Sequence, residues 1–577
     1  MHYQNFKTVV YIPAQVAARF SKEKLEKDYS FLEKYIGLDK VYLETHRGDT
    51  DVEKEQILMI KEYLETQGVE VSGGITTVIP DFEGAEAGKQ RLFGTFCYTD
   101  PAMRKRLKEI SEYTAGLFDE VILDDFYFTN CTCERCIREK GDRDWPEFRH
   151  ALMKEVSEEL VVKPAKAVNP KIKMVVKYPN WRESYHFTGY LPDAQQEIFD
   201  ATYIGTETRS PKYADQHLPE YLSYSLVRYL DNAWPDRCGG GWYDTYQCWS
   251  ADRYMEQAYL TAFAKAKEMM FFQWSDLIEN YFVGGMGIQL KKIDAMMSEV
   301  GAPTGISVYI PYASCGENHL EMRLGMLGIP MDPTPEFPVD GRMVVLTESA
   351  AADKDVVKKL QSHVAAGGQA LITTGFLKAA GEELRREGLT EASVTDRKLS
   401  VTRYQITEDS AGYLDDVQPI LFPEIVHGNN ASWSLVNGGN GDYHTPLILS
   451  STYGKGKIFI LSIPDNYADL YRIPELVTDA LKCVLSGEGF VSGKDFSVFT
   501  YDDGSMILYR YVKGDIRPAH VKVYTKKNAR MLKDTVSGET FIPAFVTLRE
   551  GWESESYLVA DVILQPGIFR KLKWENG

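Results

Sequence analysis

An eightfold alternation of short apolar runs with amphipathic stretches fills the chain up to about residue 300, and it constrains the fold more than any other feature. The β-branched apolar runs are typical of buried parallel strands, and the stretches between them have helical periodicity. Eight such repeats predict a (β/α)8 barrel, the TIM barrel. The expected strands are Thr8–Ile12, Lys40–Leu43, Glu70–Gly73, Glu120–Leu123, Lys171–Val176, Ala201–Ile204, Gly241–Tyr243 and Glu268–Phe272. The expected helices are Lys22–Tyr35, Val52–Gln67, Pro101–Leu117, Trp145–Val168, Pro192–Phe199, Pro219–Asn232, Ala251–Lys265 and Ile288–Val300.

The pattern changes after Pro303, where a second set of buried strands begins. Each of these strands is followed by a turn or a helix, which indicates an open α/β domain of the doubly wound, flavodoxin-like type. Its expected strands are Ser307–Ile310, Met343–Leu346, Ala370–Thr373 and Lys457–Leu461. The segment Leu384–Pro446 is polar, and we expect it to be an irregular insertion.

From about Val491 the chain alternates apolar and polar residues without a helical stretch, which predicts a small C-terminal β-sandwich. Its expected strands are Ser497–Thr500, Met506–Tyr511, His520–Tyr524 and Tyr557–Leu564. The sequence therefore predicts three domains. These are the barrel at residues 1–302, the flavodoxin-like domain at 303–489 and the β-sandwich at 490–577.

Composition narrows the classes of function. The 577 residues are 44% hydrophobic without a signal peptide or a run of about 18 apolar residues, so we expect a globular, cytoplasmic protein that is not inserted in a membrane. A net charge of −18 argues against nucleic acid as a partner. Aromatic residues reach 12%, and aromatic rings beside carboxylates are typical of sugar-binding sites. No glycine-rich phosphate loop follows a strand, so no organic cofactor is expected.

Four cysteines are spaced for a metal ion. Cys131, Cys133 and Cys136 form a C-x-C-x-x-C cluster, and Cys97 lies upstream in the preceding loop. Four thiolates suit a tetrahedral zinc, whereas eight cysteines in a chain of this length do not make a disulfide framework. We therefore predict a structural zinc that holds together the loops after the third and fourth strands.

Polar side chains follow most of the expected barrel strands, at the end where barrel enzymes carry their active sites. The fourth strand ends in Asp124 and Asp125, and the sixth is followed by Glu207 and Arg209. The remaining candidates are Glu44, His46 and Arg47 after the second strand, Lys177 and Tyr178 after the fifth, Asp244 after the seventh, and Gln273, Trp274 and Asp276 after the eighth. Of these, Glu44, His46, Lys177, Arg209, Trp274 and Asp276 are the predicted substrate-binding residues.

Glycoside hydrolysis fits acids and aromatics in this arrangement. It needs one carboxylic acid that protonates the leaving oxygen and a second carboxylate that acts as nucleophile or base. A serine hydrolase is disfavoured because the sequence has no G-x-S-x-G motif. Metal-assisted hydrolysis, with Asp124 and Asp125 joined by Glu44 and His46, is a competing hypothesis that no H-x-H or H-E-x-x-H spacing supports.

The order of domains and the cluster of Cys97, Cys131, Cys133 and Cys136 resemble glycoside hydrolase family 42, the β-galactosidases of clan A. The resemblance implies a catalytic barrel, a flavodoxin-like domain that joins protomers into a trimer, and a zinc on these four thiols. That family ends its fourth strand in Asn-Glu and takes a nucleophilic Glu from its seventh strand. Here Asp124-Asp125 and Asp244 stand at these places.

Other resemblances leave alternatives open. Consecutive aspartates after the fourth strand are similar to family 84 hexosaminidases, in which the acetamido group of the substrate is the nucleophile. Barrels of the α-galactosidase type use acids after strands four and six, which here are Asp125 and Glu207. A barrel that binds carbohydrate without catalysis is a third possibility. We predict Asp125 as nucleophile and Glu207 as acid/base, with Asp124 and Asp244 in reserve, acting on an oligosaccharide or glycoside.

Overall fold

The computed structural model describes residues 2–79, 94–339, 343–407, 413–415, 417–428, 431–514, 516–550 and 553–576. The chain divides into two compact units. We call Met1–Ser298 the barrel unit and Glu299–Gly577 the C-terminal unit. Within the described residues no helix combines the length and the apolar character that a membrane span needs.

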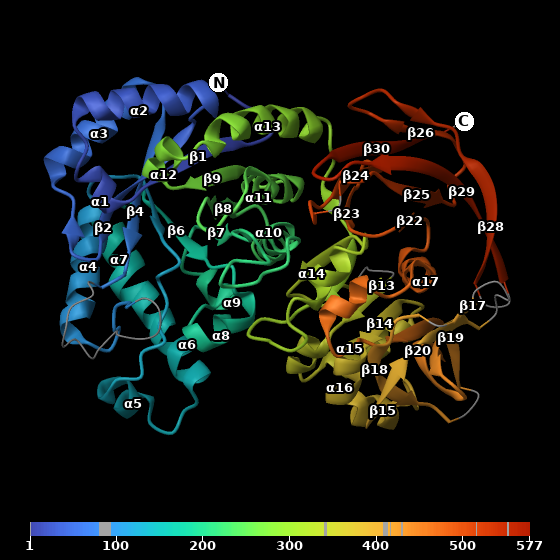
Figure 1. Cartoon of the computed structure of the whole chain (residues 1–577). Helices are drawn as coiled ribbons and strands as arrows, with labels where there is room; N and C mark the ends of the chain where they lie inside the picture. The colour runs from blue at the N-terminus through green and yellow to red at the C-terminus, as the bar shows by residue number, and fades with distance from the viewer. Residues whose placement is uncertain are drawn as a thin grey trace. The chain divides into compact units, whose positions relative to one another are not determined.

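The barrel unit contains a closed barrel of eight parallel strands, which confirms the predicted fold class (Figure 1). Closure is direct, because β1 pairs in parallel with both β2 and β9. The strands are β1 (Lys7–Ile12), β2 (Lys40–Arg47), β4 (Glu70–Thr76), β5 (Glu120–Leu123), β6 (Lys173–Tyr178), β7 (Ala201–Gly205), β8 (Cys238–Asp244) and β9 (Glu268–Phe272). The two-residue strand β3 (Thr50–Asp51) pairs with the end of β2.

Helices alternate with these strands around the barrel (Figure 1). The longer ones are α2 (Lys22–Tyr35), α3 (Lys54–Thr66), α4 (Pro101–Ala115), α6 (Trp145–Val156), α10 (Leu222–Ala233), α11 (Ala251–Phe263) and α13 (Phe282–Met297). Short helices are α1 (Ala14–Ala17), α5 (Glu134–Lys140), α7 (Lys163–Val168), α8 (Tyr185–Thr188), α9 (Pro192–Gln195) and α12 (Trp274–Glu279). The predicted helix Trp145–Val168 is one run of α6, a π-helical segment at Ser157–Val162 and α7.

Local capping explains where several helices begin. The hydroxyl of Ser21 accepts a hydrogen bond from the Lys24 amide at the start of α2, and the Asp100 carboxylate accepts from two amides at the start of α4. Side-chain caps of this kind satisfy amides that the first helical turn leaves unpaired. Pro101 at the first position of α4 loses nothing by lacking an N–H there.

Five barrel strands run further at their carboxyl ends than the sequence predicts, and the longest of these extensions, on β2 and β4, help to build the site. The second strand continues from Leu43 to Arg47, and the third from Gly73 to Thr76. Hydrophobic pattern alone misses these ends because they carry polar side chains. The side chains of Glu44, Arg47 and Thr76 remain in the barrel because they hydrogen-bond to one another.

A buried ion cluster occupies the opposite, amino-terminal end of the barrel strands. Lys40 is 2% exposed, and its Nζ lies 2.5 Å from Glu120 Oε1 and 3.2 Å from Glu268 Oε1. All three residues begin their strands. An apolar layer that includes Val9, Tyr11, Tyr42, Ile122, Val175, Tyr203, Trp242 and Met270 fills the barrel interior.

A doubly wound sheet forms the first part of the C-terminal unit. Its nine strands run in the order β12-β11-β13-β14-β21-β20-β19-β16-β17, and the first five are parallel. They are β12 (Met331–Thr334), β11 (Ile306–Tyr309), β13 (Met343–Leu346), β14 (Gln369–Thr373), β21 (Gly456–Leu461), β20 (Tyr443–Tyr453), β19 (Ser432–Asn440), β16 (Arg403–Ile406) and β17 (Tyr413–Leu414).

Helices cover both faces of this sheet. Those of the first face are α15 (Val356–Ala365) and α16 (Thr374–Arg386), which pack on Leu449 and Ile460. The next side chains along these strands, Ile448 and Leu461, face the opposite way, where α14 (Leu320–Gly325) and α17 (Glu475–Ser486) lie. The 3-10 turns Glu348–Ala352 and Tyr467–Tyr471 complete this part.

The prediction of an irregular insertion at Leu384–Pro446 is wrong for the described residues. Strands β16, β17 and β19 and the start of β20 extend the sheet there, and β15 (Ser393–Val401) pairs with β18 (Ile420–Val426). These strands are half exposed and rich in polar residues. A search for buried apolar runs therefore overlooks them.

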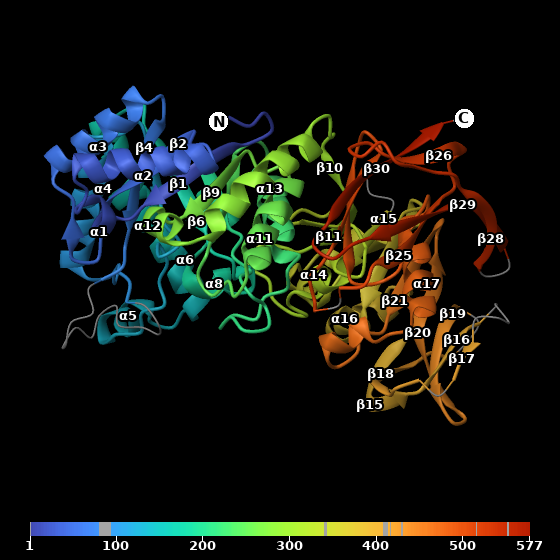
Figure 2. The same ribbon diagram turned by 45° about the horizontal axis from the view of Figure 1, so that its top comes forward.

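The end of the chain is a β-sandwich, as predicted, visible in red in Figures 1 and 2. One sheet has the order β10-β23-β24-β30-β26-β27 and the other β22-β25-β29-β28, and their facing side chains form one core that includes Phe496, Leu508, Val523 and Val562. The bounds are β10 (Pro303–Thr304), β22 (Val491–Ser492), β23 (Phe496–Tyr501), β24 (Ser505–Arg510), β25 (Ala519–Thr525), β26 (Ala529–Asp534), β27 (Thr540–Phe541), β28 (Ala544–Glu550), β29 (Glu553–Leu564) and β30 (Phe569–Asn576). The division into three domains, with boundaries at residues 302/303 and 489/490, stays a prediction.

Candidate active site at the carboxyl ends of the barrel strands

Lys177, near the end of β6, is the centre of a buried charge cluster. Its Nζ lies 2.8 Å from Asp125 Oδ2, 3.2 Å from Glu207 Oε1 and 3.6 Å from Asp124 Oδ1. Strand β6 lies between β5 and β7, so one ammonium reaches acids from both neighbours. The Lys177 side chain is 2% exposed and lies 3.9 Å above the ring of Trp242. Burial alone would lower its pKa, but the three carboxylates raise it, and Lys177 is a permanent cation.

Asp124 is fully engaged with neighbours on β2 and β4. Its Oδ2 accepts hydrogen bonds from Arg47 at 2.7 Å and Thr76 at 3.1 Å, and its Oδ1 accepts from the Asp125 amide at 2.7 Å. Burial raises its pKa, but Lys177 and Arg47 outweigh burial and lower the pKa to about 2. Asp124 is therefore a carboxylate at every pH at which the protein would work.

Asp125, the next residue, has the opposite electrostatic setting. Burial and the negative charges of Asp124 and Glu207 raise its pKa to about 8, against the lowering effect of Lys177. Its side chain is 21% exposed, so it is also the most accessible of the three acids around Lys177. Asp125 therefore combines a proton at neutral pH with access to a bound molecule.

Glu207 follows β7 and turns back over the end of that strand. A Cβ at Gly205 would lie 2.4 Å from Glu207 Oε2, so only glycine leaves room for this carboxylate. The Glu207 carbonyl accepts a hydrogen bond from Asn180 Nδ2 at 2.9 Å, which fixes the backbone. Oε2 is buried and has no hydrogen-bond partner among the described residues. Burial and the Asp244 charge raise the pKa of Glu207 against the effect of Lys177.

Asp244 and Glu44 each form an ion pair with an arginine. Arg209 binds Asp244 with two hydrogen bonds, at 3.1 Å and 2.8 Å, and has a backbone φ of 56° in the left-handed region. Glu44 is fully buried and accepts hydrogen bonds from Arg47, the Tyr11 hydroxyl and the Ala14 amide. Because their oxygens are already bound, both are better suited to positioning neighbours than to attacking a substrate.

The cluster has an excess of acids over cations. Its carboxylates are Glu44, Asp124, Asp125, Glu207 and Asp244, and its cations are Arg47, Lys177 and Arg209. The pKa values of two of these carboxyls, Asp125 and Glu207, are raised. A shared proton on that pair relieves the excess, and a pair that holds one proton supplies both an acid and a base.

Two predicted substrate-binding residues lie away from this cluster. His46 faces outward from β2, where its Nδ1 lies 2.8 Å from Asp51 Oδ1. Trp274 is completely buried, and its indole N–H donates to Asp28 of α2 at 3.2 Å. Asp276 is closer to the cluster, since the charge of Asp244, together with burial, raises its pKa. Its carboxylate accepts a hydrogen bond from Gln273 at 2.9 Å.

Sequence reasoning missed several members of the site. The Tyr11 hydroxyl donates to Glu44, the Thr76 hydroxyl donates to Asp124, and the Trp242 ring lies under the Lys177 ammonium. Asn180 donates to the Glu207 carbonyl and is itself hydrogen-bonded to Gln216. Tyr11 and Thr76 stand on strands for which no polar residue was predicted at the carboxyl end. Tyr11 lies inside its predicted strand, where the signal is a polar hydroxyl in an apolar run, and Thr76 lies three residues beyond the predicted end of its strand.

Exposed aromatic residues occupy the loops that follow β7 and β8, beside Arg209 and Asp244. Trp249 is 71% exposed, and its ring centroid lies 5.1 Å from that of Tyr213. Tyr246 lies 5.1 Å from the Arg209 guanidinium. Hydrogen bonds between Gln247 and Asp215, at 3.1 and 2.8 Å, join the two loops. We call Tyr213, Tyr246 and Trp249 the aromatic platform.

The four predicted cysteine ligands come together as expected. The Sγ atoms of Cys97, Cys131, Cys133 and Cys136 all lie within 4.8 Å of one another, with Cys97 Sγ 3.9 Å from Cys133 and 3.7 Å from Cys136. Zn–S bonds of about 2.3 Å in a tetrahedron place sulfurs about 3.8 Å apart. Among the described residues this is the one group of His, Cys, Asp or Glu side chains arranged to share a metal ion. The arrangement with Glu44, His46, Asp124 and Asp125 around a metal is not formed.

Comparison with known families and proteins places the chain among glycosidase-like sequences. The family described as "Probable glycosyl hydrolase, catalytic domain" matches residues 1–300. A family described as the second domain of uncharacterized protein SSO3021 matches residues 301–466. The chain is 26% identical over 503 residues to uncharacterized protein SSO3021 of Saccharolobus solfataricus, an alignment that covers 80% of this chain and 82% of that protein.

Solved structures with the same fold include glycosidases. The β-galactosidase of Bacillus circulans sp. alkalophilus has a TM-score of 0.66 at 12% identity, over 99% of this chain and 100% of that one. The α-L-fucosidase isoenzyme 2 of Paenibacillus thiaminolyticus has a TM-score of 0.67 at 11% identity, over 100% of both chains. At such identities the likeness shows the fold, a barrel followed by further sheet-rich domains.

Proposed function

Because the chain belongs to the family of probable glycosyl hydrolase catalytic domains, we propose that it hydrolyses a glycosidic bond with Asp125 and Glu207 as the catalytic pair. The observation that carries this proposal is the ammonium of Lys177, which contacts both carboxylates from the strand between them. Both have raised pKa values, so the pair can hold one proton between two carboxyl groups that contact the same ammonium. The reserve acids Asp124 and Asp244 are engaged by arginines.

The separation of the pair favours a retaining mechanism. Asp125 Oδ2 and Glu207 Oε1 lie 2.8 and 3.2 Å from one nitrogen, so these oxygens are at most about 6.0 Å apart. Retaining glycosidases hold their carboxyl groups about 5–5.5 Å apart, whereas inverting ones leave about 6.5–9.5 Å for a water molecule. The chain therefore forms a glycosyl-enzyme ester on one carboxylate.

The charges favour Asp125 as acid/base and Glu207 as nucleophile, the reverse of the roles predicted from sequence. Asp125 has its pKa raised to about 8 beside the ionised Asp124, and its partly exposed side chain can reach the leaving group and later a water molecule. Glu207 lies deeper, with one oxygen on Lys177 and the other without a partner among the described residues. That oxygen lies buried against Gly205, so its attack on the anomeric carbon requires the Glu207 side chain to turn toward the substrate.

The proposed hydrolysis takes two steps. Protonated Asp125 gives its proton to the leaving oxygen while Glu207 attacks the anomeric carbon, so the glycosidic bond breaks as the ester bond forms. Asp125, now ionised, takes a proton from water, and the hydroxyl attacks the same carbon and releases Glu207. Lys177 remains charged throughout and stabilises whichever carboxylate is ionised.

The aromatic platform supports binding of the part of the substrate beyond the cleaved bond. Sugar rings stack their C–H faces on aromatic rings, and Tyr213, Tyr246 and Trp249 are exposed beside the loops that carry Glu207 and Asp244. We therefore propose an oligosaccharide, or a glycoside with a bulky leaving group, as the substrate.

A panel of nitrophenyl glycosides tests the function. It begins with β-D-galactosides and α-L-fucosides, the sugars that name two similar structures, and includes N-acetyl-β-D-hexosaminides. Asp125→Asn should lose at least about two orders of magnitude on glycosides with poor leaving groups and much less on dinitrophenyl glycosides, which need no acid. Glu207→Gln should lose activity on both. Glu220→Gln is the matched control, because Glu220 is buried in the same barrel but pairs with Arg253.

Two outcomes would favour other functions. Turnover of hexosaminides alone, with loss in Asp124→Asn, would support the substrate-assisted hexosaminidase in which consecutive aspartates serve the acetamido group. The three hydrogen bonds that already engage Asp124 speak against it. Sugar binding without turnover of any glycoside would support a barrel that binds carbohydrate without catalysis.

We also propose that the four-cysteine cluster holds a structural zinc and that the chain forms a trimer. Sulfur separations of 3.7 and 3.9 Å support the first. The second rests on the resemblance to a family whose flavodoxin-like domain joins protomers. Light scattering that gives three times the chain mass of 65.5 kDa supports it, and a monomeric mass refutes it.

A further inference from the structure

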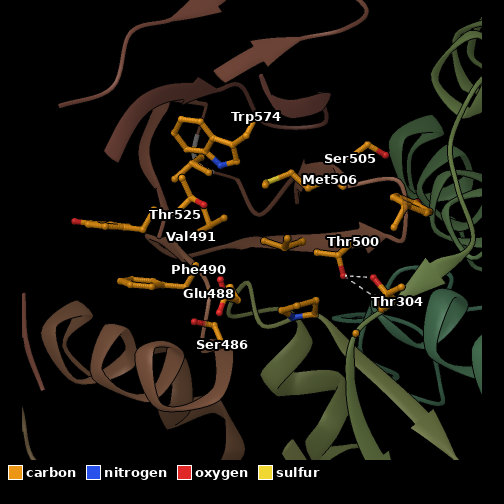
Figure 3. Close-up of a pocket in the computed structure, with 18 of the residues that line it drawn as sticks. Thr304, Ser486, Glu488, Phe490, Val491, Thr500, Ser505, Met506, Thr525 and Trp574 are labelled. Carbon is orange, nitrogen blue, oxygen red and sulfur yellow. Dashed lines mark hydrogen bonds between the residues drawn. The ribbon is translucent and has the colours of Figure 1, made fainter. Parts of the chain in front are cut away.

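A cavity of about 560 Å³ lies within the C-terminal unit, where no residue of the catalytic cluster contributes (Figure 3). Its walls come from β10, the end of α17 with the residues that follow it, and strands β23, β24, β25 and β30. Small-molecule sites in proteins have volumes of about 300–1,000 Å³ and often lie where two structural layers meet. The cavity is therefore large enough for one or two sugar rings.

Aromatic residues line two sides of the cavity. Figure 3 shows Trp574 and Met506 on one side, with Ser486, Glu488 and Phe490 on the other. Phe490 is stacked on Tyr524, with centroids 4.5 Å apart and planes at 6°. A rigid aromatic stack opposite an indole provides faces on which the C–H side of a sugar ring packs.

The lining contains five serine and threonine hydroxyls beside charged side chains. They belong to Thr304, Ser486, Thr500, Ser505 and Thr525. Two buried polar atoms of the lining, Ser486 Oγ and Trp574 Nε1, have no hydrogen-bond partner among the described residues. Because both atoms are inaccessible to solvent, a ligand in the cavity would reach them only after a shift of the Ser486 and Trp574 side chains.

Two of the three cations in the lining are already used. The buried Lys482 donates to the carbonyls of Val491 and Gly493 at 2.9 Å each, and Lys573 lies 3.0 Å from Asp503. An anionic ligand such as a phosphate would find these two cations occupied, and the third lining cation, Lys527, shares the cavity with the carboxylate of Glu488. A neutral molecule with hydroxyls on its edge and C–H groups on its faces fits the lining better.

We propose that this cavity is a second carbohydrate site, which binds a neutral mono- or disaccharide independently of the catalytic pair. Trp574 stacks on the sugar, and the hydroxyls of the lining bind its edge. The site would hold a glycan on the protein while the barrel acts on another part of it. It requires no turnover, so it can be present whether or not the barrel is a glycosidase.

The test is calorimetric titration of the full-length protein with lactose, cellobiose and maltose, supported by saturation-transfer NMR. Trp574→Ala should weaken binding of the preferred disaccharide at least tenfold, and Trp574→Phe should weaken it less because it keeps a ring. Turnover of nitrophenyl glycosides should not change in either variant. Met506→Trp, which fills the cavity from β24, is the second variant if Trp574→Ala does not fold.

Three results overturn the proposal: none of the three disaccharides binds the wild type at concentrations up to about 50 mM, Trp574→Ala binds as the wild type does, or Met506→Trp does so. Failure of the glycosidase proposal is separate. A protein without turnover whose sugar binding is lost in Trp574→Ala still has this site. A protein with turnover whose binding is lost only in Glu207→Gln does not.

Discussion

Replacement of Lys177 by methionine removes the cation that three carboxylates share while keeping a side chain of similar length. At contacts of 2.8, 3.2 and 3.6 Å, each ion pair is worth roughly 5 kcal/mol at an effective dielectric constant of about 20. The cost of burying the ammonium offsets most of this, and loss of one partner of a buried pair typically costs a net of about 3–5 kcal/mol. We expect Lys177→Met to be destabilised by that amount near neutral pH.

The destabilisation should depend on pH with a definite sign. Without Lys177 the pKa of Glu207 rises further in the folded protein, so Glu207 keeps a proton there that it loses in the unfolded chain. The folded state then binds more protons than the unfolded state, and its stability falls as pH rises above the unfolded pKa. One such proton is worth about 1.4 kcal/mol per pH unit, or roughly 4 kcal/mol between pH 5 and pH 8. Lys177→Met should therefore be closest to the wild type at pH 5.

Lys40→Met is the matched control. Lys40 is also 2% exposed and also contacts glutamates from three other strands, but at the opposite end of the same barrel. Thermal unfolding midpoints at pH 5, 6.5 and 8 measure stability, and turnover per folded molecule measures function. Lys40→Met should lose stability and keep its turnover, whereas Lys177→Met should lose both, with kcat/KM lower by at least about two orders of magnitude. Equal turnover in the two variants would refute the role we assign to Lys177.

Three further predictions concern the metal, the platform and the glycine beneath Glu207. Elemental analysis should find one zinc per chain, and Cys133→Ser should lose it. Cys315→Ser is the control and should keep the zinc, because Cys315 is an exposed thiol of the C-terminal unit. Absence of zinc from the wild type would disprove the metal site. Trp249→Ala should raise KM about tenfold with little change in kcat, whereas Phe545→Ala, which removes another exposed ring, should change neither. Gly205→Ala should lower kcat at least tenfold because its Cβ meets Glu207 Oε2 at 2.4 Å, while Gly284→Ala, whose nearest atoms are 3.9 Å away, should be silent.

The sequence predicts the barrel well because buried parallel strands are continuous apolar runs. The strands Glu120–Leu123 and Glu268–Phe272 are correct to the residue, and the others differ mainly at their ends. The ends are harder because polar residues such as Arg47 and Thr76 stay in the strands only through partners from other strands. The same limit hides the half-exposed strands between Leu384 and Pro446.

The candidate site is partly predictable for the same reason. Position at a strand end identifies Asp124, Asp125, Lys177, Glu207 and Asp244, all of which the structure brings together. Which way a side chain points depends on packing that the sequence does not state. His46 faces outward because β2 has a register irregularity between Glu44 and His46, and Trp274 is buried because it opens the unpredicted helix α12.

Asp124 provides the sharpest test of how the acids divide their work. Its pKa is held at about 2 by Lys177 and Arg47 against the effect of burial, so it is a fixed negative charge next to Asp125. That charge is one of the causes that raise the pKa of Asp125 to about 8. Asp124→Asn removes the charge and keeps an oxygen that can accept from the Asp125 amide.

The pKa of Asp125 should then fall, because one negative neighbour is lost. If Asp125 is the proton donor, activity decreases on the alkaline side where Asp125 ionises, and Asp124→Asn should move that limb to lower pH by about one unit. The acidic limb, which reports ionisation of Glu207, should move much less because burial and Asp244 are the main causes of its raised pKa. A variant whose alkaline limb stays in place while its acidic limb moves would show that Asp125 is the nucleophile and Glu207 the acid.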